Sequence, residues 1–146
     1  MKCAETIETD VPGTQSGNQI RLPMGLLGFE QMKDYILLVN PAEEPFRWLQ
    51  VKGDASLAFV VIDPFLVMPD YHPDIPQQDV DFLGVSQPED VVLYNIVTLH
   101  GANRATVNLK GPLVINRHTG VGKQVIIANA TQYSVQHPLP LAEVSA

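Results

Sequence analysis

Short apolar runs rich in Val, Ile and Leu recur along the chain, and Gly, Pro, Asn and Asp separate them. This pattern is typical of short strands joined by turns. The run over residues 57–62 is apolar throughout, as expected of a strand that is covered on both faces. Strands are predicted over residues 4–9, 19–22, 35–39, 48–51, 57–62, 91–98, 105–109, 113–116 and 123–128.

Helical patterns are scarce, and the best candidate covers residues 76–83. Pro76 suits the first turn of that helix, and Gly84 can end it in the left-handed conformation. A shorter helical turn is predicted over residues 29–34. Many short strands with one or two short helices predict a mostly β fold, either a small β-barrel-like structure or a sandwich.

The composition fits a single domain of 146 residues, of which 45% are hydrophobic and 17% charged. We expect this domain to span residues 1–146, with its core over about 4–140. No apolar run approaches the ~20 residues that cross a bilayer, and the polar N-terminus shows no signal peptide. Cys3 is the only cysteine, which excludes an internal disulfide and a cysteine-based zinc site. These features predict a soluble cytoplasmic protein that does not bind membranes.

Acidic residues are concentrated in the middle third of the chain. The net charge is −7 and the pI is about 4.8, whereas a direct nucleic-acid binder normally carries a basic face. Residues 53–103 contain eight acidic residues and no Lys or Arg, while residues 1–52 have a net charge of −2 and residues 104–146 of +3. Direct binding of nucleic acid is therefore not expected.

Three polar residues of the middle third, Asp70, His72 and Asp74, alternate and would project to one side of an extended segment. Two carboxylates and an imidazole could bind a divalent cation. Pro69 and Pro73 interrupt the stretch, however, so a solvated loop is the better interpretation and no metal site is predicted.

Asp63 has two interpretations, because it ends an apolar strand and precedes Pro64. It could act in catalysis, or it could cap a turn by binding its own backbone, as Asp-Pro sequences often do. Capping is the favoured interpretation of Asp63. The sequence also contains no complete serine-nucleophile motif, so we predict no catalytic residue and no cofactor. The alternative function is a small-ligand-binding or hydrolytic β-barrel with Asp63, Asp70 and His72 at its polar centre. A deep pocket with perturbed carboxylates would favour that alternative.

An apolar stretch over residues 65–69 follows the strand over 57–62 and leads into the acidic segment. It could continue the core, or it could form a contact patch with an acidic rim for a protein partner. The second interpretation gives the candidate partner-binding residues Phe65, Met68, Asp70, Tyr71, Asp74, Asp79, Asp81 and Asp90.

Four blocks of the sequence resemble one protein family in the same order. The run Leu-Pro-Met-Gly-Leu-Leu-Gly-Phe-Glu over residues 22–30 resembles the N-terminal signature of the flagellar assembly factor FliW family. The other blocks cover residues 46–50, 57–65 and 105–116. The resemblance extends over roughly residues 20–140.

The resemblance implies a small β-barrel-like protein without enzymatic activity, substrate or cofactor. Members of this family bind the translational regulator CsrA and stop it from repressing flagellin mRNA. They also bind flagellin, so that free flagellin releases CsrA and lowers further flagellin synthesis. The expected partners are therefore CsrA and flagellin, and we expect the chain to be a monomer on its own.

The resemblance also gives the uneven charge a candidate role. CsrA must present a basic surface to RNA phosphates, and residues 53–103 could place negative potential beside that surface and repel RNA. The basic third over residues 104–146 could orient docking. The alternative is that the acidic residues only keep the protein soluble.

Overall fold

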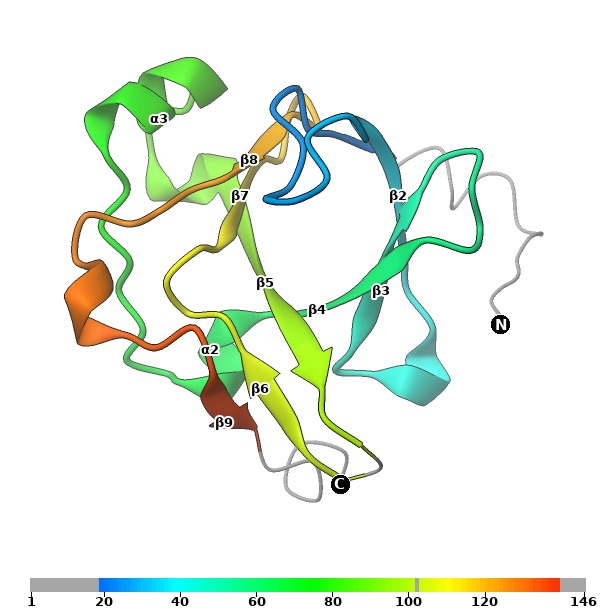
Figure 1. Cartoon of the computed structure of the whole chain (residues 1–146). Coiled ribbons are helices and arrows are strands. Elements are labelled where there is room, and N and C mark those ends of the chain that lie inside the picture. The colour runs from blue at the N-terminus through cyan, green and yellow to red at the C-terminus, as the bar shows by residue number, and fades with distance from the viewer. Residues whose placement is uncertain (1–18, 102, 140–146) are drawn as a thin grey trace.

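The computed structural model describes residues 19–101 and 103–139, which form one nine-stranded sheet with short helices beside it (Figure 1). All strand pairs are antiparallel. The strands are β1 (Gln19–Arg21), β2 (Asp34–Leu38), β3 (Arg47–Val51), β4 (Ala58–Ile62), β5 (Val91–Leu99), β6 (Ala105–Val107), β7 (Leu113–Asn116), β8 (Gly122–Gln124) and β9 (His137–Leu139).

The sheet runs in the order β1-β2-β3-β4-β5-β6-β9, while β7 pairs with β5 and β8 pairs with β7. It curls so that the β7–β8 hairpin approaches β1 (Figure 1), where the Arg21 N–H donates to the Gly120 carbonyl at 2.9 Å. Arg21 and Val121 form only an isolated bridge there, so the sheet is barrel-like but not closed. The prediction of a mostly β fold is confirmed.

Buried side chains form three clusters. The first cluster joins β1, β2, β3 and β7 and includes Tyr35. The second cluster joins β4, β6 and β9 and includes Val107. The third cluster includes Leu83, which lies in the second α-helix. Successive side chains of a strand point to opposite faces of the sheet. The long strand β5 accordingly gives Tyr94 to the first cluster and Val97 to the second.

Two short α-helices, α2 (Pro64–Val67) and α3 (Gln77–Leu83), lie between β4 and β5 in the sequence. The helix α3 confirms the helix predicted over residues 76–83 with one residue fewer, because Pro76 is its N-cap and not part of its first turn, and Gly84 ends it at φ 69°. None of the helices in the described residues is long and apolar enough to cross a membrane. Single 3₁₀ turns cover Pro41–Glu43, Pro88–Asp90 and Ala130–Gln132.

Four expectations from the sequence differ from the structure or lie outside the residues that it describes. No helix forms over residues 29–34, because the Met32 N–H closes a turn by donating to the Phe29 carbonyl at 3.1 Å and Asp34 already begins β2. The run over 57–62 is covered less completely than predicted, because only its last two residues are buried and the others are half-buried. The strand predicted over 4–9 lies outside the described residues.

The strand predicted over residues 123–128 ends at Gln124. Beyond it the chain stays beside the segment before β7, and the Val125 N–H donates to the Pro112 carbonyl at 2.9 Å. Pro112 has no N–H to return, so a regular ladder cannot form at that position.

Candidate functional site

An apolar groove of about 490 Å³ lies between α2, the segment that follows it, α3 and the first half of β5. We call it the α2–α3 groove. None of its lining residues is Asp, Glu, Lys or Arg. Its walls include Phe65, Tyr71, Ile75, Leu83, Val91 and Leu93.

The sequence places Phe65 on the groove by ending β4 abruptly. The Asp63 carboxylate accepts a hydrogen bond from the Phe65 N–H at 2.9 Å, and Pro64 occupies the first turn of α2. Proline and an aspartate cap both favour a helix start, so the strand turns into α2 at once. Phe65 and Leu66 remain 44% and 59% exposed, whereas Met68 packs against the second core cluster. The favoured interpretation of Asp63 as a cap is confirmed.

Tyr71 forms a groove wall from a buried position, since only 3% of the residue is exposed. Its hydroxyl donates to the Leu109 carbonyl at 2.7 Å and lies 3.4 Å from the Asn95 amide nitrogen. Burial raises the pKa of this hydroxyl above its ordinary value. Tyr71 therefore belongs to the core, and only its ring can contribute to a docking surface.

The two aspartates of α3 have different environments. Asp79 is 4% exposed and accepts a hydrogen bond from the Lys123 ammonium at 2.5 Å, which ties α3 to β8. The same ammonium lies 5.4 Å from the centre of the Phe82 ring. Asp81 is exposed and accepts from the Gln77 amide at 2.9 Å. Asp79 was a candidate for partner contact in the sequence, and the structure places it in an internal ion pair instead.

Asp90 caps the turn that leads into β5. Its carboxylate accepts from the Ser86 and Gln87 N–H groups at 3.1 and 3.0 Å and contacts His118 Nε2 at 3.0 Å. The backbone donor of Ser86, followed by His118, lowers the pKa of the Asp90 carboxyl to about 2. This carboxylate therefore stabilises the start of β5 through contacts within the protein.

The exposed acidic residues Asp70 and Asp74 lie in the segment between α2 and α3, next to groove-lining residues in the sequence. Asp81 is also exposed and follows the groove-lining residue Val80 in the sequence, and we call these three residues the acidic rim. His72 Nδ1 contacts the Asp70 backbone carbonyl at 2.8 Å and the Tyr133 hydroxyl at 3.2 Å. Within residues 19–101 and 103–139, no three His, Cys, Asp or Glu side chains are grouped to hold a metal ion.

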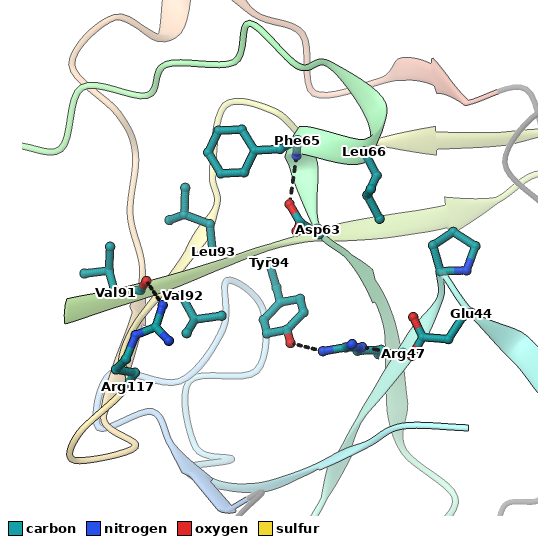
Figure 2. Close-up of a pocket in the computed structure, with 11 residues that line it drawn as sticks. Glu44, Arg47, Asp63, Phe65, Leu66, Val91, Val92, Leu93, Tyr94 and Arg117 are labelled. Atoms are coloured by element: carbon teal, nitrogen blue, oxygen red, sulfur yellow. Dashed lines mark hydrogen bonds and ion pairs between the residues drawn. The ribbon is translucent and has the colours of Figure 1, made fainter. Parts of the chain in front are cut away.

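A second, smaller pocket of about 250 Å³ adjoins the groove and shares Phe65, Val91 and Leu93 with it. We call it the arginine slot, because Arg47 and Arg117 both line it (Figure 2). The Arg47 guanidinium donates to the Tyr94 hydroxyl at 2.6 Å and pairs with Glu44 at 3.3 Å. The Arg117 guanidinium donates to the Val91 carbonyl at 3.2 Å.

Comparison with known proteins identifies the family. The family model described as "FliW protein" matches residues 4–139. The chain belongs to the FliW family. A flagellar assembly factor FliW from Leptospira biflexa is 40% identical over 126 residues, which cover 83% of this chain and 82% of that protein. The one from Moorella thermoacetica is 35% identical over 122 residues, covering 82% of this chain and 77% of that protein.

A crystal structure of the flagellar assembly factor FliW has the same fold, with a TM-score of 0.76 and 34% sequence identity. The match covers 90% of this chain and 89% of that one. Membership of this family supports a role in flagellum assembly.

Proposed function

We propose that the chain is a non-enzymatic regulator that binds CsrA in the cytoplasm and relieves its repression of flagellin mRNA. Flagellin competes with CsrA for the protein, which couples flagellin synthesis to flagellum assembly. The resemblance of the sequence to FliW led to this expectation, and membership of the FliW family supports it.

The observation that carries the proposal is the α2–α3 groove, which has apolar walls and whose lining residues are followed or preceded in the sequence by exposed carboxylates. An apolar patch with a charged rim suits a protein partner of opposite charge. CsrA must carry basic side chains to bind RNA phosphates. Phe65 gives the contact an exposed apolar side chain, and Asp70, Asp74 and Asp81 give it the complementary charge.

The same three carboxylates can oppose RNA binding by repulsion. They face solvent, and exposed charges act over about 8 Å at physiological ionic strength. RNA approaching CsrA in the complex would meet this negative potential without the RNA site itself being filled. The effect should weaken as salt is added.

The alternative function, a small-ligand-binding or hydrolytic β-barrel, is less well supported. It needs a polar pocket with perturbed carboxylates. Asp63 caps α2, Asp90 caps the turn before β5, and His72 contacts the Asp70 backbone instead of its carboxylate. Asp63 lines the arginine slot, His72 lines the α2–α3 groove and Asp70 lines neither, so the three groups of this alternative do not share one polar pocket.

The test replaces the rim carboxylates together, as Asp70→Asn, Asp74→Asn and Asp81→Asn. These positions are exposed, and the substitutions leave the Asp79 ion pair and the Asp90 cap intact. CsrA binding is measured by calorimetry, and RNA exclusion by titrating flagellin leader RNA into the complex at several salt concentrations. We expect RNA to regain access to CsrA in the complex with the triple variant, most clearly at low salt.

The matched control removes three carboxylates elsewhere, as Glu30→Gln, Asp34→Asn and Asp54→Asn, and should behave as wild type. If the wild-type protein binds neither CsrA nor flagellin, the proposed function is wrong. If the rim variant binds CsrA and still excludes RNA as well as wild type, the acidic rim does not act by repulsion.

A further inference from the structure

Within residues 19–101 and 103–139, the first half of β5 has one edge without a neighbouring strand. β4 pairs with β5 only as far as Ile62, which lies opposite Asn95. The same register would place Pro64 opposite Leu93. Proline has no N–H, and the Pro64 carbonyl accepts the Met68 N–H at 2.9 Å within α2. Neither backbone group of Pro64 can therefore pair with Leu93.

The backbone groups of Leu93 point toward this vacated edge. In an antiparallel pair, the N–H and C=O of alternate residues face alternate neighbours. The Asn116 N–H donates to the Val121 carbonyl on the β8 side, so Ile115 faces β5, where its partner is Val92. Leu93 consequently faces away from β7. Among the described residues, none forms a hydrogen bond to the Leu93 backbone on that side.

The arginine slot lies along this edge. It is lined by four consecutive residues, Val91 to Tyr94, as expected where a strand presents its edge and not one face. Figure 2 shows Arg117 beside Val91 and Arg47 beside Tyr94. Arg47 is paired with Glu44, whereas Arg117 has no carboxylate within ion-pair distance among the described residues.

We propose that the arginine slot binds an extended segment of a partner protein, which adds as a short strand beside Leu93 and places a carboxylate on Arg117. Strand addition gives affinity through main-chain hydrogen bonds, and a guanidinium binds a carboxylate with two parallel bonds. Residues 53–103 carry many acidic side chains, which disfavour a carboxylate at other positions of the added strand. Arg117 therefore fixes where along that strand the carboxylate lies. The inference rests on the proposed function, which supplies CsrA and flagellin as the proteins to be tested.

Substitutions at Leu93 separate its backbone from its side chain. Leu93→Pro removes the N–H that faces the slot, and Leu93→Val keeps it with a similar apolar side chain. We expect Leu93→Pro to weaken the partner that uses the slot about tenfold, as for the loss of one hydrogen bond, and Leu93→Val to remain close to wild type. Arg117→Glu should weaken the same partner at least as much, because it opposes the carboxylate. Calorimetric titration with CsrA and with flagellin measures both.

Amide hydrogen exchange of the wild-type complex tests the same contact without a variant. The Leu93 amide should become protected when the partner is added, whereas the Val92 amide, which faces β7, should be protected already. The proposal is overturned if Leu93 stays unprotected in both complexes, or if Leu93→Pro and Arg117→Glu bind both partners as wild type does. Failure of the wild-type protein to bind either partner would overturn the proposed function as well.

Discussion

The two halves of β5 are held by different kinds of contact. Its second half lies between two strands, with Val97 opposite Val60 of β4 on one edge and Val107 of β6 on the other. Its first half has β7 on one edge, where Val92 lies opposite Ile115, and none of the described strands lies on the other edge. Backbone hydrogen bonds to neighbouring strands hold both edges of the second half. In the first half, side-chain hydrogen bonds take the place of one of these ladders.

Two side chains stabilise the first half of β5 directly, and a third holds α3, which lines the α2–α3 groove together with that half. Asp90 caps its start, Arg117 binds the Val91 carbonyl, and Asn116 holds the end of α3 by donating to the Leu83 carbonyl at 2.9 Å. Both the α2–α3 groove and the arginine slot lie on this half. A strand that loses one neighbour can thus stay ordered while leaving an edge available for a partner.

Proline substitutions are expected to affect the two halves of β5 most differently. Val97 and Leu93 face the same edge, but Val97 pairs there with β4 whereas Leu93 does not. We expect Val97→Pro to lower the free energy of unfolding by about 3 kcal/mol, because a buried ladder bond is lost and the ring disturbs the sheet. Leu93→Pro should cost less than about 1 kcal/mol, because proline is tolerated at an open strand edge. Urea denaturation with circular dichroism measures both. Equal losses would mean that the Leu93 N–H is bonded within the fold.

The strands β4, β5 and β7 could be predicted better than β9, which lies at the end of the sheet. β4, β5 and β7 follow apolar runs that end at turn residues, and their predicted and observed bounds nearly agree. β9 is absent from the sequence prediction, because Pro138 stands in its middle and proline argues against a strand. Pro138 is tolerated because, in the part of the chain that the structure describes, β9 pairs only with β6 and leaves its other edge without a strand.

The candidate site could be predicted only in part. Phe65 and the acidic residues were identified by their place after an apolar strand. Val91 and Leu93 were not identified as groove residues, because which side chains of β5 face α3 depends on the register with β7. Asp79 and Asp81 could not be separated either. Residues two apart on a helix point to different sides, and only the position of Lys123 on β8 decides which one is buried.

A smaller effect is expected from the ion pair that holds α3 over the first half of β5. Asp79→Asn removes the charge opposite Lys123, whose side chain is one-quarter exposed, and should lower the free energy of unfolding by about 2 kcal/mol. Asp81→Asn is the control, because its carboxylate is exposed and should contribute less than about 0.5 kcal/mol. Chemical denaturation compares the two variants. If they lose the same amount, α3 is not held by the ion pair.

The smallest effect is the pH dependence that Asp90 gives to the start of β5. Its pKa is about 2 in the folded protein, below the ordinary value of 3.8, so the unfolded chain takes up this proton more readily as pH falls. The stability that Asp90 contributes is complete above about pH 4 and is lost as the pH falls towards 2. Asp90→Asn should remove this part of the pH dependence, because an amide accepts hydrogen bonds without titrating. Urea midpoints measured between pH 5 and pH 2 test it, with Asp81→Asn as the matched control. If Asp90→Asn shows the same loss between pH 4 and pH 2 as wild type, the cap on β5 is not the source of that loss.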